Sequence, residues 1–304
     1  MATRPPLVSV IIPTYNRWPM IAEAVQSVLA QTFDAFELIV VDDGSADNTP
    51  RLLSSCDSRL KIFSKPHAGV AAARNAGVAI SLGKYIAFLD SDDLWSPAKL
   101  ATQADFMERN SGAHICQTEE IWIRGGVRVN PKARHRKPAG DIFRRSLELC
   151  LVSPSAVMMT KELFKLTGGF DESLPVCEDY DLWLRIAVGH PVFLIDSPLV
   201  IKRGGHADQL SRSVWGMDRF RVLAIAKLLR AGLVGDRRQW AVNSLRQKVS
   251  ILAAGAAKRG KVEETRNFEA LLAEFLKGAG DDRASHSGLC IGQRISSTDK
   301  GALA

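Results

Sequence analysis

Short apolar runs alternate with amphipathic stretches along the first hundred residues of the chain. The runs are rich in β-branched residues and stop at turn-forming or charged residues, which predicts buried strands. The stretches between them repeat apolar residues at helical spacing, as at Ile21, Val25 and Val28. We expect strands at 8–12, 38–41, 60–63 and 85–89 and helices at 19–30, 47–55 and 69–82. Continuous apolar strands that alternate with helices indicate an α/β protein with a parallel sheet covered on both faces.

The pattern is mixed from about residue 110 to 205 and becomes helical after about 214. A strand is expected at 114–123, followed by a basic stretch, Arg124–Arg145, and a helix that begins near Glu178. The residues beyond about 278 are small and polar, so we expect them to be disordered. The expected organisation is a domain over 1–213, a helical region over 214–278 and a disordered tail over 279–304.

Composition narrows the class of protein. With 46% apolar and 24% charged residues, the 304-residue chain is neither collagen-like nor fully disordered. Its 40 Lys and Arg against 33 Asp and Glu give a net charge of +7, which favours anionic partners without choosing among them. The five cysteines form no CxxC and argue against a disulfide framework or a zinc site. We find no secretory signal and no run of about 18–20 apolar residues, and therefore expect a cytoplasmic protein.

Two acidic clusters end expected strands, Asp42–Ser45 after the second and Asp90–Asp93 after the fourth. Ligands of parallel sheets bind beyond the carboxyl ends of the strands, which is where both clusters fall. Carboxylates two positions apart on an extended segment point the same way, so Asp90 and Asp92 can share a hard divalent cation. The alternative is structural, because Asp is also common at helix N-caps and in turns.

Seven segments occur in a characteristic order. They are Val10–Asn16, Gln31–Phe33, Phe36–Ser45, Gly69–Gly77, Tyr85–Asp93, Gly168–Glu172 and Glu178–Asp179. Together they resemble glycosyltransferase family 2, whose members are inverting enzymes of GT-A fold that use nucleotide-diphosphate sugars. The resemblance spans roughly residues 7–213 and implies a Rossmann-like, mixed and mostly parallel sheet flanked by helices, followed here by a helical region that it does not cover.

The resemblance also implies which residues bind the nucleotide sugar. Asp42 is preferred over Asp43 as the carboxylate that reads uracil and ribose, and only one of the two is expected to face the nucleotide, because adjacent strand residues point in opposite directions. Arg74 would approach the diphosphate or hold the acidic strand end, the alternative being an exposed helix arginine. The implied nucleotide-sugar residues are Pro13, Thr14, Tyr15, Asn16, Asp42, Asp43, Arg74, Asp90 and Ser91.

A divalent metal, Mn2+ or Mg2+, is the implied cofactor. Asp92 would bind it, and Asp90 would bind ribose or metal-bound water. His206 is either a further metal ligand or a solvated loop residue, and the residues themselves leave both open. The chemical need is that breaking the C1–O bond of the sugar leaves negative charge on a nucleoside diphosphate, which a metal neutralises.

Glu178 and Asp179 open a helix whose expected buried face is Leu182, Trp183, Ile186 and Ala187. Acidic residues at a helix N-terminus are often purely structural, since the helix dipole favours them. The resemblance instead makes Asp179, beside Glu178, the general base that takes a proton from the attacking acceptor hydroxyl. The segment Gly168–Glu172 would shape the acceptor side of the site.

The expected function is metal-dependent, inverting transfer of a single sugar from a UDP-sugar to the hydroxyl of a glycan, lipid-linked or small-molecule acceptor. The chain lacks the QxxRW segment and membrane spans of processive synthases. One alternative, a sugar nucleotidyltransferase, would need a glycine-rich phosphate loop where Pro13–Asn16 stands. The other is a non-catalytic nucleotide-sugar-binding scaffold, which the presence of both Asp92 and Asp179 disfavours.

Partners beyond the substrates follow from two regions. The basic stretch Arg124–Arg145 is expected to be a solvated loop or to meet an anionic acceptor or the inner face of a membrane. It has no nucleic-acid motif, so we expect no nucleic-acid partner. The C-terminal helices could pack on the catalytic domain, form a homodimer or approach the membrane, and the sequence does not choose.

Overall fold

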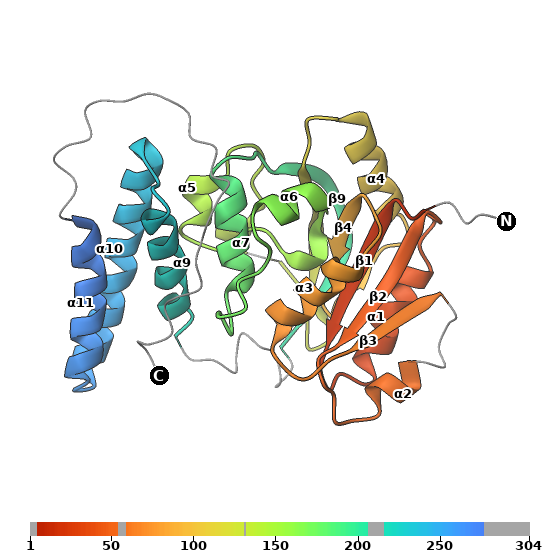
Figure 1. Ribbon diagram of the computed structural model, residues 1–304, viewed down its shortest axis with the longest axis horizontal. Helices are drawn as coiled ribbons and strands as arrows, with labels where there is room; N and C mark the ends of the chain where they lie inside the picture. Colours follow the sequence, from red (N-terminus) through yellow and green to blue (C-terminus); the bar gives the residue numbers. More distant parts are fainter. Residues whose placement is uncertain (1–4, 54–58, 131, 206–215, 277–304) are drawn as a thin grey trace. The chain divides into compact units, whose positions relative to one another are not determined.

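The computed structural model describes residues 5–53, 59–130, 132–205 and 216–276 (Figure 1). Its contacts divide the chain into two compact units, Met1–Ala224 and Ile225–Ala304. The expected disordered tail at 279–304 and the candidate ligand His206 lie outside the described residues.

A mixed sheet forms the centre of the first unit. Its described strands run in the spatial order β3-β2-β1-β4-β8-β6-β9-β5, and β7 pairs with β6. Their bounds are β1 Val8–Thr14, β2 Phe36–Asp42, β3 Leu60–Ser64, β4 Tyr85–Phe88, β5 Leu94–Trp95, β6 Ile115–Arg124, β7 Val127–Val129, β8 Val157–Thr160 and β9 Phe193–Gly204. Strands β1 to β4 are mutually parallel, as the sequence pattern predicts. The sheet is mixed because β8 runs antiparallel to both β4 and β6.

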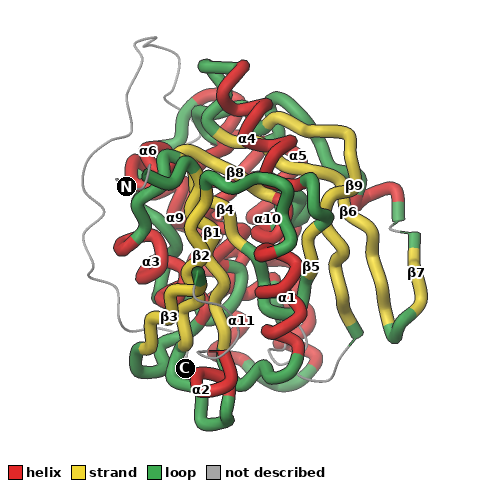
Figure 2. Tube along the Cα trace, turned by 90° about the vertical axis from the view of Figure 1, so that its right-hand side faces the viewer, coloured by secondary structure: helices red, strands yellow, loops and turns green. Residues whose placement is uncertain are grey.

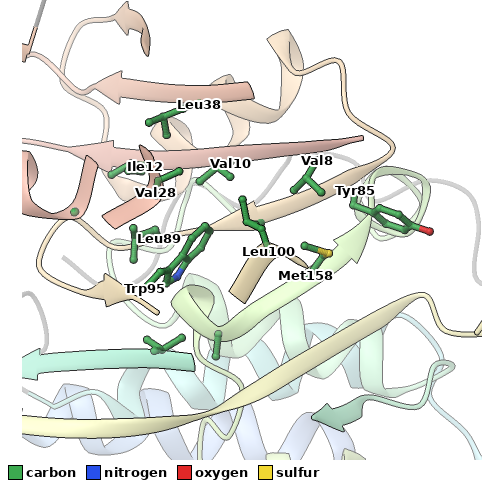
Figure 3. Packing of buried hydrophobic residues seen from close by; sticks show 14 of the residues in the cluster. Val8, Val10, Ile12, Val28, Leu38, Tyr85, Leu89, Trp95, Leu100 and Met158 are labelled. Carbon is green, nitrogen blue, oxygen red and sulfur yellow. The ribbon is translucent and has the colours of Figure 1, made fainter. Parts of the chain in front are cut away.

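Helices α1, Met20–Leu29, and α4, Lys99–Arg109, cover one face of this sheet. Strand residues of alternating position, such as Val8, Val10 and Ile12, meet Val28 and Leu100 in a fully buried core (Figure 3). The period-2 alternation of a strand and the i, i+4 spacing of a helix put these residues in one layer. This packing fixes the strand ends that carry the polar clusters.

The opposite face is covered by α3, Val70–Ile80, together with α6, Lys161–Leu166, and α7, Glu178–Ala187. Gly77 of α3 lies against β1, where an added Cβ would stand 2.5 Å from Cγ2 of Ile11. On the same face the ring of Phe88 meets those of Phe164 and Phe170. Close packing at Gly77 therefore sets α3, and Arg74 within it, directly on the sheet.

The structure extends two expectations for the middle of the chain. The expected residues of α7, Leu182, Trp183, Ile186 and Ala187, are buried, but so are Glu178, Tyr180 and Asp181, so the burial is not limited to one face. The basic stretch is not a plain solvated loop. It contains β7, the 3-10 turn η1 at Ala133–His135 and the short helix α5, Phe143–Ser146, and its Lys137 is buried in an ion pair.

The remaining helices complete the described chain. The short helix α2, Thr49–Leu53, precedes β3, and the 3-10 turn η2, Pro154–Ala156, precedes β8. The helices α9, Asp218–Arg230, α10, Gly235–Lys258, and α11, Val262–Leu276, follow β9. Figure 2 shows how the helices and strands follow one another along the trace.

The second unit is helical in its described part. Helix α10 buries a stripe at four-residue spacing, Ala241, Leu245, Val249 and Ala253, which is the pattern of one helix face packed on a neighbour. Helix α11 contributes the buried Phe268 and Phe275.

Two further expectations can be compared with the described chain. Cys116 and Cys177 are buried and free, as expected for small core residues. A search of the described helices finds none with the length and apolar character needed to cross a membrane.

Candidate active site

Polar side chains follow β1, β2 and β4 at the same edge of the sheet, because these three strands are parallel neighbours. The loops after β1 and β2 are tied together by Asn16, whose backbone lies in the left-handed region at φ 51°. Its Oδ1 accepts from the N–H of Ala46 at 2.8 Å, and its own N–H donates to Oγ of Ser45 at 2.9 Å. The order of these motifs in the sequence therefore reflects direct contact in space.

An aromatic platform stands beside these loops. Tyr15 is 43% exposed, and its ring stacks on that of His67 at a centroid distance of 4.1 Å. His67 was not among the residues expected from the sequence, since a lone histidine carries no motif signal. Its Nδ1 lies 2.8 Å from Oδ2 of Asp43, which fixes the orientation of the imidazole ring.

Asp42 and Asp43 are both buried, but they have different partners. Asp43 accepts from the N–H of Gly69 at 2.8 Å and from Nζ of Lys65 at 2.7 Å, so it holds the loop before α3. Asp42 accepts from the N–H of Ser45 at 3.2 Å and lies beside Thr14 in the register of β1 and β2. The preference for Asp42 as the base-reading carboxylate stays a prediction, and the engagement of Asp43 with its own loop favours it.

The segment after β4 is a turn and not the extended stretch expected from the sequence. The N–H of Asp93 donates to the carbonyl of Asp90 at 3.0 Å, which closes the turn around the buried Ser91. Three carboxylates meet there, because ligand atoms of Asp90, Asp92 and Asp93 lie within 4.8 Å of one another. Asp90 and Asp92 thus lie close together in the turn, as the sequence predicts, and Asp93 lies close to both.

Asp93 is the member of this group that the sequence expectations missed. It is buried, accepts from Oγ of Ser155 at 2.6 Å and from the N–H of Arg203 at 2.9 Å. Burial raises the pKa of Asp93 to about 8. The ammonium of Lys202 opposes this increase, and Asp92 and Asp90 add to it. A divalent cation with a preference for oxygen ligands fits this group, because it would favour the charged form that burial disfavours.

Arg74 joins the turn to helix α7. Its Nη2 lies 2.7 Å from Oδ1 of Asp90 and its Nη1 lies 2.5 Å from Oε1 of Glu178. The guanidinium is buried against the ring of Phe170 at 5.1 Å, and its two carboxylate partners raise its pKa against the effect of burial. Arg74 was expected either to approach the diphosphate or to hold the acidic strand end. Its bonds to Asp90 and Glu178 are those expected of the second role.

Five carboxylates gather around this bridge. We name the group Asp90, Asp92, Asp93, Glu178 and Asp179 the acid centre.

Glu178 and Asp179 begin α7 after Cys177, a residue in the left-handed backbone region at φ 64°. Such a conformation is strained for a residue other than glycine and is common at functional sites. Burial, followed by the charge of Asp179, raises the pKa of Glu178 to about 7, although Arg74 opposes the increase. Asp179 is half-buried, and its Oδ1 accepts from the N–H of Tyr180 at 2.7 Å.

The segment Gly168–Glu172 packs beside the acid centre. Gly168 and Gly169 both have positive φ, which lets the chain reverse after α6. Asn75, the neighbour of Arg74 on α3, donates to the carbonyl of Phe170 at 2.9 Å and to Glu172 at 2.8 Å. The segment thereby holds the ring of Phe170 beneath the guanidinium of Arg74. Its role on the acceptor side stays a prediction.

Lys202 of β9 is a second group that sequence reasoning missed. Its Nζ donates to Oγ of Ser153 at 3.1 Å, and the charges of Glu120, Asp93, Asp90 and Asp179 raise its pKa. Its position beside the acid centre results from the pairing of β9 with β6, which no local pattern reveals.

A cavity of about 1210 Å3 lies at the other edge of the sheet, away from the acid centre. It is lined by residues that precede the parallel strands, among them Leu7, Ala35 and Lys84. Ligands of open α/β sheets bind beyond the carboxyl ends of the strands, so its position does not match that of a donor site.

The comparison with protein families agrees with this geometry. Residues 9–166 match the model of glycosyl transferase family 2, which is more than half of the chain. This chain belongs to that family.

Curated relatives of this chain are also glycosyltransferases. The chain is 38% identical over 200 residues to an uncharacterized glycosyltransferase of Rickettsia felis, a match that covers 63% of this chain and 32% of that protein. This chain thus spans about a third of the length of the first such relatives. It is 32% identical to UDP-Glc:alpha-D-GlcNAc-diphosphoundecaprenol beta-1,3-glucosyltransferase WfgD of Escherichia coli, over 71% of this chain and 82% of that protein.

Solved structures share the fold. The chain is similar to S. aureus TarS 1-349 in complex with UDP-GlcNAc, with a TM-score of 0.62 and 19% identity over 88% of this chain and 91% of that chain. It is also similar to the mannosyltransferase PcManGT of Pyrobaculum calidifontis in complex with GDP-Man and Mn2+. There the TM-score is 0.56 and the identity 19%, over 90% of this chain and 88% of that chain. These likenesses confirm the expected GT-A fold.

Proposed function

We propose that this protein is a metal-dependent, inverting glycosyltransferase that moves a single sugar from a UDP-sugar to an acceptor hydroxyl in the synthesis of a surface glycan or glycoconjugate. The observation that carries the proposal is the bridge of Arg74 between Asp90 and Glu178. This bridge places the acidic turn after β4 next to the pair that opens α7. This contact supports a diphosphate site and a base for the incoming hydroxyl as close neighbours in the proposed reaction.

Asp92 and Asp90, with Asp93 as third carboxylate, would hold Mn2+ or Mg2+. When bound, the metal would neutralise the negative charge that develops on the nucleoside diphosphate as the C1–O bond breaks. The Mn2+ in the complex of PcManGT supports this cofactor. The stacked rings of Tyr15 and His67 offer a flat surface for the base, with the buried Asp42 nearby to accept from a ring N–H.

Asp179 is the group that takes the proton. Its neighbour Glu178 is buried and fixed to Arg74, whereas Asp179 is half-buried, which supports Asp179 as the carboxylate that an incoming hydroxyl can approach. The hydroxyl oxygen attacks C1 on the face opposite to the leaving diphosphate, its proton passes to Asp179, and the anomeric centre is inverted.

Donor and acceptor classes are proposed from the relatives. The UDP-Glc in the name of WfgD and the UDP-GlcNAc bound by TarS support a UDP-sugar donor. The diphosphoundecaprenol-linked acceptor of WfgD supports a lipid-linked glycan acceptor, and with it a cytoplasmic protein in peripheral contact with the inner face of a membrane. A homodimer through the C-terminal helices stays an open proposal.

The test is UDP release from UDP-glucose and UDP-N-acetylglucosamine with Mn2+, in the presence of a lipid-linked glycan extract. We expect Asp179→Asn to lower turnover by about 100-fold or more, because loss of a general base costs roughly that much, while UDP affinity is kept. Asp196→Asn, at an exposed position of β9, is the matched control and should retain wild-type turnover. Near-normal turnover of Asp179→Asn would exclude its role as the base. UDP binding without any release would favour the scaffold alternative.

A further inference from the structure

A second pocket, of about 290 Å3, opens beside β6. One wall is formed by Glu119, Glu120 and Trp122 of β6, and the other by the segment 132–137. Its volume is at the lower end of the range for small-molecule sites and suits a single sugar with one charged group, not a whole nucleotide sugar.

Of the basic residues that line this pocket, one is paired with a carboxylate and two are paired with none among the described residues. Lys137 pairs with Glu120 at 2.9 Å, and both side chains are buried. Lys132 and Arg136 are exposed at the rim, and within the described chain neither has an ion-pair partner. Burial lowers the pKa of His135, and the nearby Arg134, Arg124 and Lys132 lower it further, which reports a positive local potential. Against the two carboxylates Glu119 and Glu120, the three cations of the lining leave an excess of one positive charge, which favours an anion at the rim.

An aromatic surface borders the same space. The indole of Trp122 is held by its Nε1, which donates to Oε2 of Glu120 at 3.0 Å, and its ring lies 5.4 Å from that of His135. The guanidinium of Arg124 lies over the same ring, 5.8 Å from its centroid, so the part of Trp122 that lines the pocket is the apolar surface available to a ligand. The apolar C–H face of a sugar ring stacks on such surfaces, and its hydroxyls can bond to the polar rim.

The pocket is linked to the acid centre through β9. In the register of β6 and β9, Trp122 pairs with Lys202, so both side chains point to the same face of the sheet. The N–H of Arg203, the residue of β9 that follows Lys202, donates to Oδ1 of Asp93 at 2.9 Å. Strand β9 thus links the β6 wall of the pocket to the acid centre, and a ligand in the pocket would lie one strand away from that centre.

We propose that the pocket binds a sugar phosphate, the phosphate-bearing end of the acceptor, with the sugar ring on Trp122 and the phosphate on Lys132 and Arg136. This assignment rests on the proposed function, because it takes the pocket, linked through β9 to the acid centre, as part of the acceptor site. It gives the basic stretch a part in substrate recognition, which the family motifs do not include.

The experiment is a calorimetric titration with glucose 1-phosphate, in the presence of excess UDP and Mn2+ to fill the donor site. We expect the wild type to bind it, and Arg136→Gln to bind it about tenfold more weakly, since a charge-assisted hydrogen bond is lost. Arg128→Gln removes the same charge from the exposed strand β7 outside the pocket and should leave the affinity unchanged. Equal affinities in Arg136→Gln and Arg128→Gln, or no binding to the wild type, would overturn the proposal.

Two comparisons separate the parts of the ligand. Glucose and inorganic phosphate should each bind more weakly than glucose 1-phosphate, and Trp122→Leu should weaken glucose 1-phosphate but not inorganic phosphate. If inorganic phosphate binds as well as glucose 1-phosphate, the sugar contact is refuted. A protein that releases UDP normally but shows no sugar-phosphate binding refutes the pocket alone, whereas loss of UDP binding with intact sugar-phosphate binding refutes the donor assignment alone.

Discussion

The loops after β1 and β2 and the turn after β4 lie at one edge of the sheet, yet their carboxylates are held in different ways. Asp43 accepts from the backbone N–H groups of Ala68 and Gly69, and Asp42 accepts from that of Ser45. In the acid centre, Asp90 and Glu178 depend on the side chain of Arg74. Side chains also hold Asp43, through Lys65 and His67, and backbone donors also reach Asp93 and Asp179. The difference is that the link between the two acidic segments of the acid centre, Asp90 and Glu178, is made by the charge of one arginine.

This difference has a chemical consequence. Burial makes the ionised forms costly and, with the neighbouring carboxylates, raises the pKa values of Glu178 and Asp93 to about 7 and about 8, although Arg74 and Lys202 oppose the increase. In the proposed function a site of this kind would receive a cation, and the loops after β1 and β2 would receive the neutral base of the nucleotide.

The largest effect is expected from Arg74→Gln. It leaves two carboxylates in a buried place without their cation, and we expect the free energy of unfolding to fall by about 3–4 kcal/mol. Urea denaturation measures this change. The control Arg109→Gln breaks an exposed pair with Asp105 and should cost less than about 0.5 kcal/mol. If both variants lose the same small amount, the acid centre does not depend on charge balance.

The pH dependence of stability should differ between wild type and Glu178→Gln. Because the folded-state pKa of Glu178 is raised from 4.5 to about 7, its contribution is fully present below pH 4.5 and is lost as the pH rises through 7. Relative to Glu178→Gln, the wild type should lose on the order of 2–3 kcal/mol between pH 4.5 and 7.5. Denaturation curves at several pH values measure it, and parallel pH profiles of the two proteins would contradict the expectation.

A smaller effect is expected from Asp43→Asn. The amide keeps one acceptor oxygen for the loop 65–69 but loses the charge that faces Lys65, so stability should fall by about 2 kcal/mol. Asp196→Asn on the exposed face of β9 is the control, with an expected change within about 0.5 kcal/mol. A loss larger than that of Arg74→Gln would reverse the comparison between the two regions.

The sequence predicted the first region better than the second. The strands of the parallel half and the motif at Pro13–Asn16 depend on local patterns, and the order β1, β2, β4 follows from their connections. Arg74 and Glu178, by contrast, are 104 positions apart, and nothing local tells which carboxylates one arginine will bridge.

Long-range pairing also explains the remaining misses. Lys202 and Lys137 become part of buried networks only when β9 and the segment before α5 pack beside β6. Asp93 belongs to the acidic segment 90–93, but the sequence analysis expected this segment to be extended. In an extended segment only Asp90 and Asp92 point to the same side, so Asp93 was left out. The turn at 90–93 brings the third carboxylate inward instead.

The central claim is that the acid centre holds a divalent cation that carries the nucleoside diphosphate. A calorimetric titration of UDP into the protein with Mn2+, and again with a chelator, tests it most directly. We predict that UDP binds with Mn2+, at least about tenfold more weakly without it, and that Asp92→Asn removes this difference because a carboxylate ligand is lost. The same UDP affinity with and without Mn2+ in the wild type would contradict the claim.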